Sequence, residues 1–204
     1  MHFIISREEL RRVYKPAGDV SLRKELKALD GHCVSFIGRS PFVLIGTSDG
    51  KGHADVTPKG DRPGFVAVLD NRTIAIPDRP GNNRLDTLEN LLVEPSIGLL
   101  FLIPGMDETL RINGRAKITA DDALRMRFEV DGKLPQAVIL IEVEAAYMHC
   151  AKAFMRSQLW HPETWPDRAS LPTLGRILKD QLALDQSAEA TDRWLDDAYA
   201  KSMW

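Results

Sequence analysis

Residues 73–92 contain the side chains whose types and spacing could bind an anion. An apolar run is followed by a Pro/Gly/Asn-rich turn and then by an amphipathic helical pattern. Arg79 and Arg84 flank the expected helix start, with Asn82 and Asn83 between them. The first turn of a helix has unpaired N–H groups and partial positive charge, so arginine is normally unfavourable there. Amides, asparagines and two guanidinium groups at one helix end predict a phosphate site.

The same arginines also have an ordinary structural interpretation. In that interpretation Arg79 and Arg84 lie on a solvated turn and pair with Asp78 and Asp86. Basic turns with nearby carboxylates are common on protein surfaces, so this segment alone leaves both interpretations open.

A second basic group lies near the C-terminal end of the sequence. Lys152 and Arg156 are four residues apart and share one face of a predicted helix, with Trp160 one turn further on. Two cations and an indole on one face could flank a planar anionic ligand. The alternative is an amphipathic helix with solvated basic residues.

Motifs for other chemistries are missing from the sequence. It contains no HExxH, paired CxxC, GxGxxG, Walker A or GxSxG pattern. His149 directly precedes Cys150, but neighbouring helical side chains point in different directions, so they do not suggest a nucleophile and its base. The sequence therefore predicts no metal site and leaves catalytic residues unidentified.

Composition excludes several classes of partner. The 204 residues carry a formal net charge of -2, and two cysteines cannot form a disulfide framework. No apolar run reaches the roughly 20 residues that span a bilayer. We therefore expect a cytoplasmic protein with reduced thiols and with neither nucleic-acid nor membrane partners.

The pattern of apolar residues predicts a mainly β protein of the α+β class. Ser6–Glu9 forms a capping box for one helix, and Leu22, Leu26 and Leu29 share a face of a second helix from Ser21. Both helices are expected to pack outside a sheet. Six or seven antiparallel strands then follow. The β-rich runs are residues 34–37, 42–47, 65–69, 73–76, 96–103, 109–118 and 137–145.

Helical patterns interrupt and follow these runs. Helices are expected near Asn83, near Thr119, and from about residue 144 to Trp160, with a final pair over residues 173–183 and 189–200. The sequence thus predicts a single domain over residues 1–204. It consists of N-terminal helices (1–30), an antiparallel barrel (34–145) and a C-terminal helical segment (146–204).

The ordered series of motifs resembles the pyridoxamine 5'-phosphate oxidase-like flavoproteins, specifically a bacterial branch of FMN-dependent enzymes. The resemblance covers about residues 36–165. It lies in the motifs TPKGD, PGF, TIAI, PDRPGNNRLDTLENLL, SIGLLFLIPG, ETLRINGRA and MHCAKAFMRSQLW, in that order.

The resemblance implies a split β-barrel that forms a homodimer with FMN sites at the subunit interface. The FMN phosphate would be held by a strand-loop-helix unit, and residues 53–59 would line the ring and ribityl chain. RINGRA would reach the cofactor from the partner, and the C-terminal signature would border the flavin. The residues implied are Thr57, Lys59, Arg79, Asn83, Arg84, Thr87, Arg111, Asn113, Lys152, Arg156 and Trp160.

The sequence departs from true pyridoxamine-phosphate oxidases. It has no Arg-x-His element, and Thr109 stands where those oxidases commonly have glutamine. The leading hypothesis is an FMN-dependent oxidoreductase acting on an unidentified small organic molecule. The alternatives are a flavin carrier or sensor without turnover, and a protein that binds haem or a deazaflavin, with His53 or His149 as axial ligand.

Overall fold

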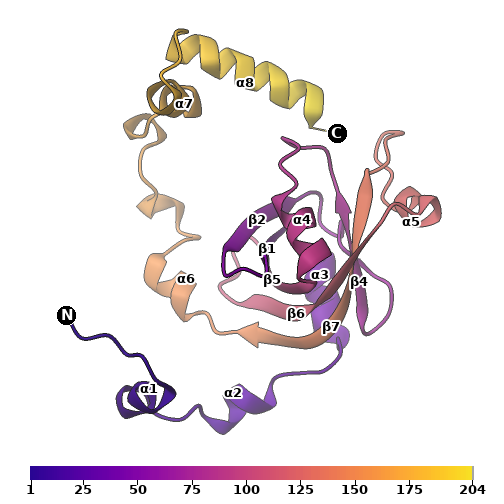
Figure 1. Ribbon diagram of the computed structural model, residues 1–204, viewed down its shortest axis with the longest axis vertical. Coiled ribbons are helices and arrows are strands. Elements are labelled where there is room, and N and C mark those ends of the chain that lie inside the picture. Colours follow the sequence, from indigo (N-terminus) through magenta and orange to yellow (C-terminus); the bar gives the residue numbers. More distant parts are fainter. Residues whose placement is uncertain (204) are drawn as a thin grey trace.

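The protein is described by a computed structural model over residues 1–203; Trp204, the end of the predicted C-terminal helical segment, lies outside the described residues. A curled sheet forms its centre, and chain segments extend away from it at both ends (Figure 1). The strands are β1 (Phe42–Ser48), β2 (Ala54–Gly60), β3 (Ala67–Val68), β4 (Thr73–Asp78), β5 (Ser96–Leu102), β6 (Thr109–Thr119) and β7 (Ala137–His149).

All neighbouring strands pair antiparallel, in the order β2-β1-β5-β6-β7-β4-β3. The strands β2 and β3 are edges, so the curled sheet is not closed by backbone hydrogen bonds. This arrangement is a split barrel, and it confirms the predicted antiparallel α+β fold. Pro58 lies in β2, where an edge strand tolerates the missing N–H.

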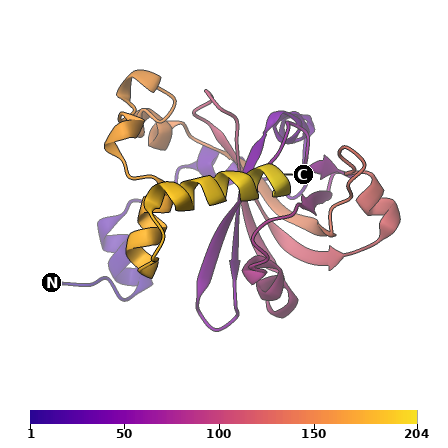
Figure 2. The same ribbon diagram turned by 90° about the horizontal axis from the view of Figure 1, so that it is seen from above.

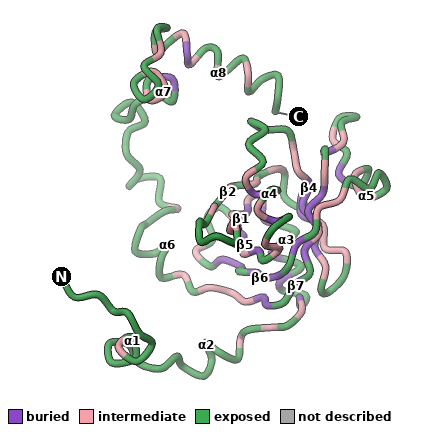
Figure 3. The backbone as a smooth tube through the Cα atoms, in the orientation of Figure 1, coloured by how far each residue is buried: buried purple, intermediate pink, exposed green. Residues whose placement is uncertain are grey.

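Alternation along the strands separates an inner from an outer face. In β1, Val43, Ile45 and Thr47 are buried, whereas the intervening residues are only partly covered. The inner face meets the apolar residues of the other strands in one continuous core (Figure 3). We call the opposite side of β1, β2, β5, β6 and the end of β7 the outer face.

Eight α-helices and two short 3-10 helices accompany the sheet within residues 1–203. The helices α3 and α4 pack on the barrel through Phe36, Ile37 and Leu91. The bounds are α1 (Arg7–Val13), α2 (Asp19–Arg23), α3 (Gly31–Arg39), α4 (Asp86–Val93), α5 (Asp122–Met126), α6 (Lys152–Ser157), η1 (Pro162–Thr164), η2 (Arg168–Ser170), α7 (Leu174–Leu182) and α8 (Ala188–Ser202).

The first predicted strand, residues 34–37, is wrong because this segment lies inside α3. The Asp30 side chain caps the helix by accepting a hydrogen bond from the Cys33 N–H at 2.8 Å. Cys33, Phe36 and Ile37 then share the buried side of the helix, so helical spacing prevails over the β propensity of the segment. The strand count still reaches seven because β2 adds one.

The predicted helix from about residue 144 is also wrong at its start. The strand β7 continues to His149, and Arg111 pairs with Tyr147 there. Pairing with β6 overrides the helical propensity of the alanines. The helix α6 covers only Lys152–Ser157 and ends at Gln158, which has a left-handed φ of 51°.

Smaller differences concern helix starts. The helix expected near Asn83 begins at Asp86, and that expected near Thr119 begins at Asp122 behind an Asp121 cap. The predicted cap at Ser6 is confirmed, since its side chain accepts from the Glu9 N–H, but the Glu9 carboxylate accepts from the Ile5 N–H and not from the Ser6 N–H as in a full capping box. The helix expected from Ser21 is α2, which ends before Leu26, and neither α1 nor α2 buries a residue.

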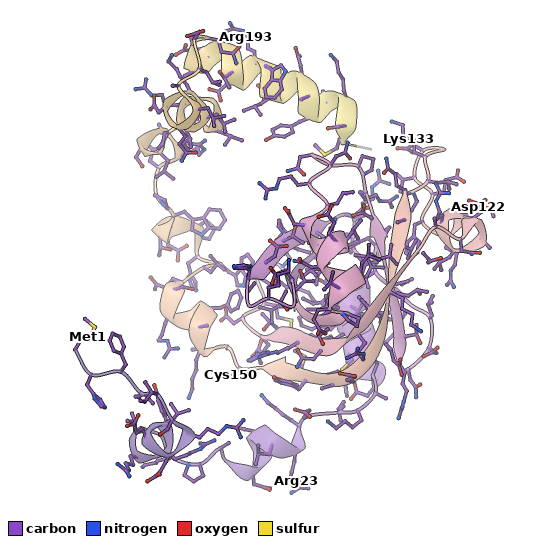
Figure 4. The ribbon with its side chains drawn as sticks, viewed as in Figure 1. Met1, Arg23, Asp122, Lys133, Cys150 and Arg193 are labelled. Atoms are coloured by element: carbon purple, nitrogen blue, oxygen red, sulfur yellow. The ribbon has the colours of Figure 1, made fainter. Side chains whose placement is uncertain are left out.

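Two arms leave the barrel. The N-terminal arm comprises residues 1–24, and the C-terminal arm comprises residues 150–203 and begins at Cys150 (Figure 4). In both views the N-terminal arm and α6 lie on the same side of the barrel, whereas α8 turns back across it (Figures 1 and 2). The helices α7 and α8 pack against each other, and the Gly175 N–H donates to Asp192 Oδ1 at 2.8 Å. The final helical pair is therefore confirmed.

Within residues 1–203, no helix is both long enough and apolar enough to cross a bilayer.

A bulge interrupts the β6–β7 ladder at Gly114. Asn113 pairs with Ala145 and Gly114 with Val143, so Glu144 is the extra residue of β7. A Cβ on Gly114 would come within 2.1 Å of the Glu142 carbonyl oxygen. Only glycine therefore permits this close approach of the two strands.

We expect Gly114→Ala to destabilise the protein by about 1–3 kcal/mol, because the added methyl group meets backbone and not a movable side chain. Urea unfolding followed by circular dichroism measures the change. Gly38→Ala is the control: no atom lies within 4 Å of the new Cβ in α3. It should leave stability unchanged or raise it by up to about 1 kcal/mol. Equal effects of the two substitutions would contradict the steric argument.

Candidate functional site

An anion-binding candidate lies where β2 meets the turn between β4 and α4. A cavity of about 390 Å³ occupies this position, and we call it the anion cavity. Six residues from the predicted phosphate and ribityl regions line it together. They are Thr57, Lys59, Arg79, Asn83, Arg84 and Thr87.

The anion cavity lies at the split of the barrel. The edge strand β2 supplies Thr57 and Lys59, and the chain around β4 supplies the arginines. Side chains join the two borders: Lys59 Nζ contacts Asp78 Oδ1 at 2.6 Å, and Thr87 Oγ1 donates to Asp55 Oδ2 at 3.1 Å. Because no backbone ladder fills this space, polar groups from both borders surround it.

The turn before α4 is shaped by its asparagines. Asn83 has a φ of 56°, in the left-handed region that asparagine tolerates better than most residues. The Asn82 side chain accepts a hydrogen bond from the Arg84 N–H at 3.0 Å. These local features end the turn at Arg84, just before the helix.

The N-terminus of α4 provides further donors. Leu85 occupies the N-cap position and makes no side-chain capping bond. The first-turn N–H groups of α4 are consequently available beside Thr87, which lines the anion cavity. Such amides favour an anion through hydrogen bonds and the helix dipole.

The three cations of the cavity have different surroundings. Arg79 Nε pairs with Asp61 Oδ2 at 3.0 Å, and its Nη1 donates to the Phe128 carbonyl at 2.6 Å. The side chains of Arg79 and Asp61 are only 17% and 3% exposed, respectively. Arg84 pairs with Asp86 at 2.8 Å, but its side chain is 75% exposed. Arg79 is therefore held as part of the structure, whereas Arg84 has room to move.

Simple energetics identify the groups that could hold an anion. An exposed ion pair such as Arg84–Asp86 contributes about 0–1 kcal/mol, whereas a hydrogen bond to a charged group contributes about 1.5–3 kcal/mol. Arg84 could therefore exchange Asp86 for a phosphate; while paired, Asp86 raises the pKa of Arg84. Lys59 has three N–H donors and could contact both Asp78 and a phosphate. The alternative prediction, in which the two arginines pair with Asp78 and Asp86, is correct for Arg84, which pairs with Asp86. Asp78, however, pairs with Lys59 and not with Arg79.

Arg111 and Asn113 do not line the anion cavity of their own chain. Both lie on the outer face of β6, where Arg111 Nε donates to Asn113 Oδ1 at 3.4 Å. Thr57 and Lys59 lie on the inner side of β2, opposite Ile45 and Val43. The two groups of predicted residues thus occupy opposite faces of the sheet.

The C-terminal signature is also separate from the anion cavity. Lys152 and Arg156 lie on α6, but Trp160 follows the left-handed Gln158 and is not on the helix. The Trp160 ring stacks on Phe154 with centroids 5.8 Å apart, and its Nε1 donates to the Met106 carbonyl at 2.9 Å. The prediction that Lys152, Arg156 and Trp160 share one helix face is therefore wrong for Trp160.

Sequence reasoning missed several groups near these sites. Asp61 is the buried partner of Arg79, and no local pattern indicates a contact 18 residues away. On the outer face, the Tyr147 and His149 rings lie with their centroids 5.3 Å apart and their planes tilted by 44°. The helical propensity of this segment hides the alternation of its side chains. A period-2 count through His149 could have found it.

Within residues 1–203, no group of three or more His, Cys, Asp and Glu side chains could hold a metal ion.

Both cysteines are free. Burial raises the pKa of the Cys33 thiol to about 11, whereas Cys150 is exposed.

Comparison with protein families gives one match. A family model described as pyridoxamine 5'-phosphate oxidase matches residues 29–150, from just before α3 to the end of β7. A comparison with curated protein sequences found no match.

Solved structures with similar architecture include the HupZ protein of Group A Streptococcus. It is 20% identical, with 58% of this chain and 91% of that chain covered, at a TM-score of 0.48. A candidate pyridoxamine 5'-phosphate oxidase of Lactobacillus delbrueckii is 21% identical, with 61% and 98% covered, at a TM-score of 0.48. Likeness at this level does not indicate what this chain binds.

The contrast between the two arginines predicts different effects on stability. Arg79→Met should lower the free energy of unfolding by about 3–5 kcal/mol, because it leaves the Asp61 carboxylate buried without its cation. Arg84→Met should change it by less than about 1 kcal/mol, because the Arg84–Asp86 pair is exposed. Chemical denaturation of both variants tests this. Similar losses would mean that Arg84 is also structural.

Proposed function

Because the chain belongs to the pyridoxamine 5'-phosphate oxidase family, we propose that it binds FMN and acts as a cytoplasmic FMN-dependent oxidoreductase on a small organic substrate. The observation that carries the proposal is the convergence on the anion cavity of six polar side chains, all of which lie within the matched residues 29–150. An FMN phosphate carries almost two negative charges and needs several donors together.

The residues of the anion cavity fit such a phosphate. Arg84 and Lys59 would provide charge-assisted hydrogen bonds, and Thr57, Thr87 and the first amides of α4 would provide neutral donors. Arg79 would position the turn through Asp61 and Phe128. Bound FMN would supply the hydride-transfer chemistry, so the protein need not supply a nucleophile.

We further propose a homodimer with its FMN sites at the subunit interface. Arg111 and Asn113, on the outer face, would then reach the cofactor of the partner subunit. The exposed apolar residues of both arms support the dimer: Phe3 and Tyr14 are 68% and 61% exposed, and Trp165 and Trp194 are 56% and 60% exposed. A second copy could cover such residues.

Lys152, Arg156 and Trp160 are proposed to border the flavin in that dimer. Positive charge near the ring would stabilise the reduced, anionic flavin and raise its potential. Oxidation of vitamin B6 phosphate is not proposed, because the sequence lacks the Arg-x-His element.

The proposal is tested by the ligand that the protein retains. Protein purified from flavin-replete cells should be yellow, and heat should release a compound with the mass of FMN. A Soret band, stoichiometric FAD, or no flavin binding after reconstitution would contradict the proposal. Redox cycling with candidate substrates then separates an enzyme from a flavin carrier.

We expect Arg84→Ala to weaken FMN binding about tenfold or more, because one charge-assisted phosphate contact is lost. Arg72→Ala is the matched control: Arg72 precedes β4 and lines a different cavity. Its dissociation constant should stay within about twofold of the wild-type value. Flavin fluorescence titration measures both. Equal constants would exclude Arg84 from the phosphate site.

Light scattering at micromolar concentration should give the mass of two chains for the FMN-loaded protein. The physical reason is the burial of the exposed apolar residues of both arms, since burying apolar surface contributes about 25 cal/mol for each Å². A monomeric mass with FMN still bound would contradict sites shared between subunits.

A further inference from the structure

A second candidate ligand site lies on the outer face, apart from the anion cavity. It is a groove of about 300 Å³ with aliphatic walls that include Leu44, Val56 and Leu100. Arg111 and His149 supply its polar border. We call it the outer groove. Its volume is at the lower end of the range for small-molecule sites.

The floor of the outer groove is formed by two glycines on neighbouring strands. Gly46 of β1 pairs directly with Gly98 of β5. Neither has a positive φ, and a Cβ would lie 3.8 Å from the Gly98 carbonyl oxygen at Gly46 and 3.7 Å from Asn113 Oδ1 at Gly98. Backbone conformation and packing therefore do not require glycine at either position. The missing side chains instead leave a flat area over the sheet.

Two cations meet at one edge of this area. The Arg111 guanidinium carbon lies 5.8 Å from the Tyr147 ring centroid, and Lys24 Nζ lies 5.7 Å from the same centroid. Lys24 is held there by donating to the Met148 carbonyl at 2.6 Å. Tyr147 therefore fixes two positive charges near the outer groove.

The charge of this cluster is unbalanced. Among the described residues, no carboxylate lies within 4.0 Å of the side-chain nitrogens of Lys24 or Arg111. In the anion cavity, by contrast, each of the three cations has a carboxylate partner. No carboxylate therefore neutralises either cation directly, and an anion placed near both would gain attraction from each.

His149 adds a group that can exchange a proton. Its ring lies at the border of the outer groove and is tilted by 44° against the Tyr147 ring, with the centroids 5.3 Å apart. Burial, Arg111 and Lys24 together lower the pKa of His149. The imidazole is therefore neutral near pH 7 and can either donate or accept one hydrogen bond.

We propose that the outer groove binds a small planar carboxylate, with its carboxyl group near Arg111 and Lys24 and its ring over Gly46 and Gly98. His149 contacts a polar substituent of that ring. Binding itself does not require FMN. That this planar carboxylate is also the substrate of the enzyme rests on the proposed function, in which the outer face meets the cofactor of the partner subunit.

Isothermal titration calorimetry with salicylate, a planar carboxylate with a neighbouring hydroxyl group, tests the site. We expect wild-type protein to bind it, and Arg111→Gln and Lys24→Gln to weaken binding at least tenfold and at least threefold, respectively. Lys117→Gln is the control, because Lys117 is an exposed cation of the same strand outside the outer groove. Its affinity should stay within twofold of wild type.

Two results would overturn the proposal: no salicylate binding at millimolar concentration, or equal affinities for Arg111→Gln and Lys117→Gln. If Arg111→Gln weakens the dimer but leaves salicylate binding unchanged, a second copy occupies the outer groove and the proposal is also wrong. A separate FMN titration of the wild type distinguishes this failure from failure of the proposed function.

The pH dependence tests the part played by His149. Salicylate should bind more tightly as pH falls through the lowered pKa of His149, because protonation adds a third positive charge beside Arg111 and Lys24. The charged and titratable groups that face His149 are Arg111, Lys24 and Tyr147. His149→Gln should abolish the pH dependence of binding while keeping most of the affinity at pH 7. An unchanged profile would remove His149 from the site.

Discussion

The pairing of β6 with β7 joins the two halves of the barrel. On one side β5, β1 and β2 attach through β6, and on the other side β4 and β3 attach through β7. Gly114 allows the close contact and the bulge at the centre of this ladder. The curl of the sheet then brings β2 back toward β4, so the borders of the anion cavity come from opposite halves. Without the central ladder, Lys59 and Asp78 would not be brought into contact.

Sequence reasoning was successful where the determining interactions are local. The antiparallel strands follow from alternation and turn residues, and the side chains around Arg79–Thr87 lie close together because one turn and one helix start connect them. It failed where distant pairing decides the conformation. Residues 34–37 have high β propensity but pack as a helix, and the alanines before Tyr147 are held in a strand by β6. The Arg79–Asp61 pair has no local signal of any kind.

The period of a strand also explains why the predicted site residues divide into two groups. Thr57 and Lys59 point inward and meet the α4 turn, whereas Arg111 and Asn113 point outward. A sequence motif specifies which residues are present, but the face on which each lies depends on register. A single chain therefore presents two polar surfaces, one at the split and one on the outer face.

The split itself has a consequence for dynamics. The borders of the anion cavity are joined by the side-chain contacts Lys59–Asp78, Thr87–Asp55 and Arg79–Asp61, and the strands β2 and β4 share no ladder. Widening this gap would break those contacts while every strand pair remained intact. Such an opening costs less than global unfolding and can occur on a faster timescale. The seam of the barrel can thus open without any loss of secondary structure.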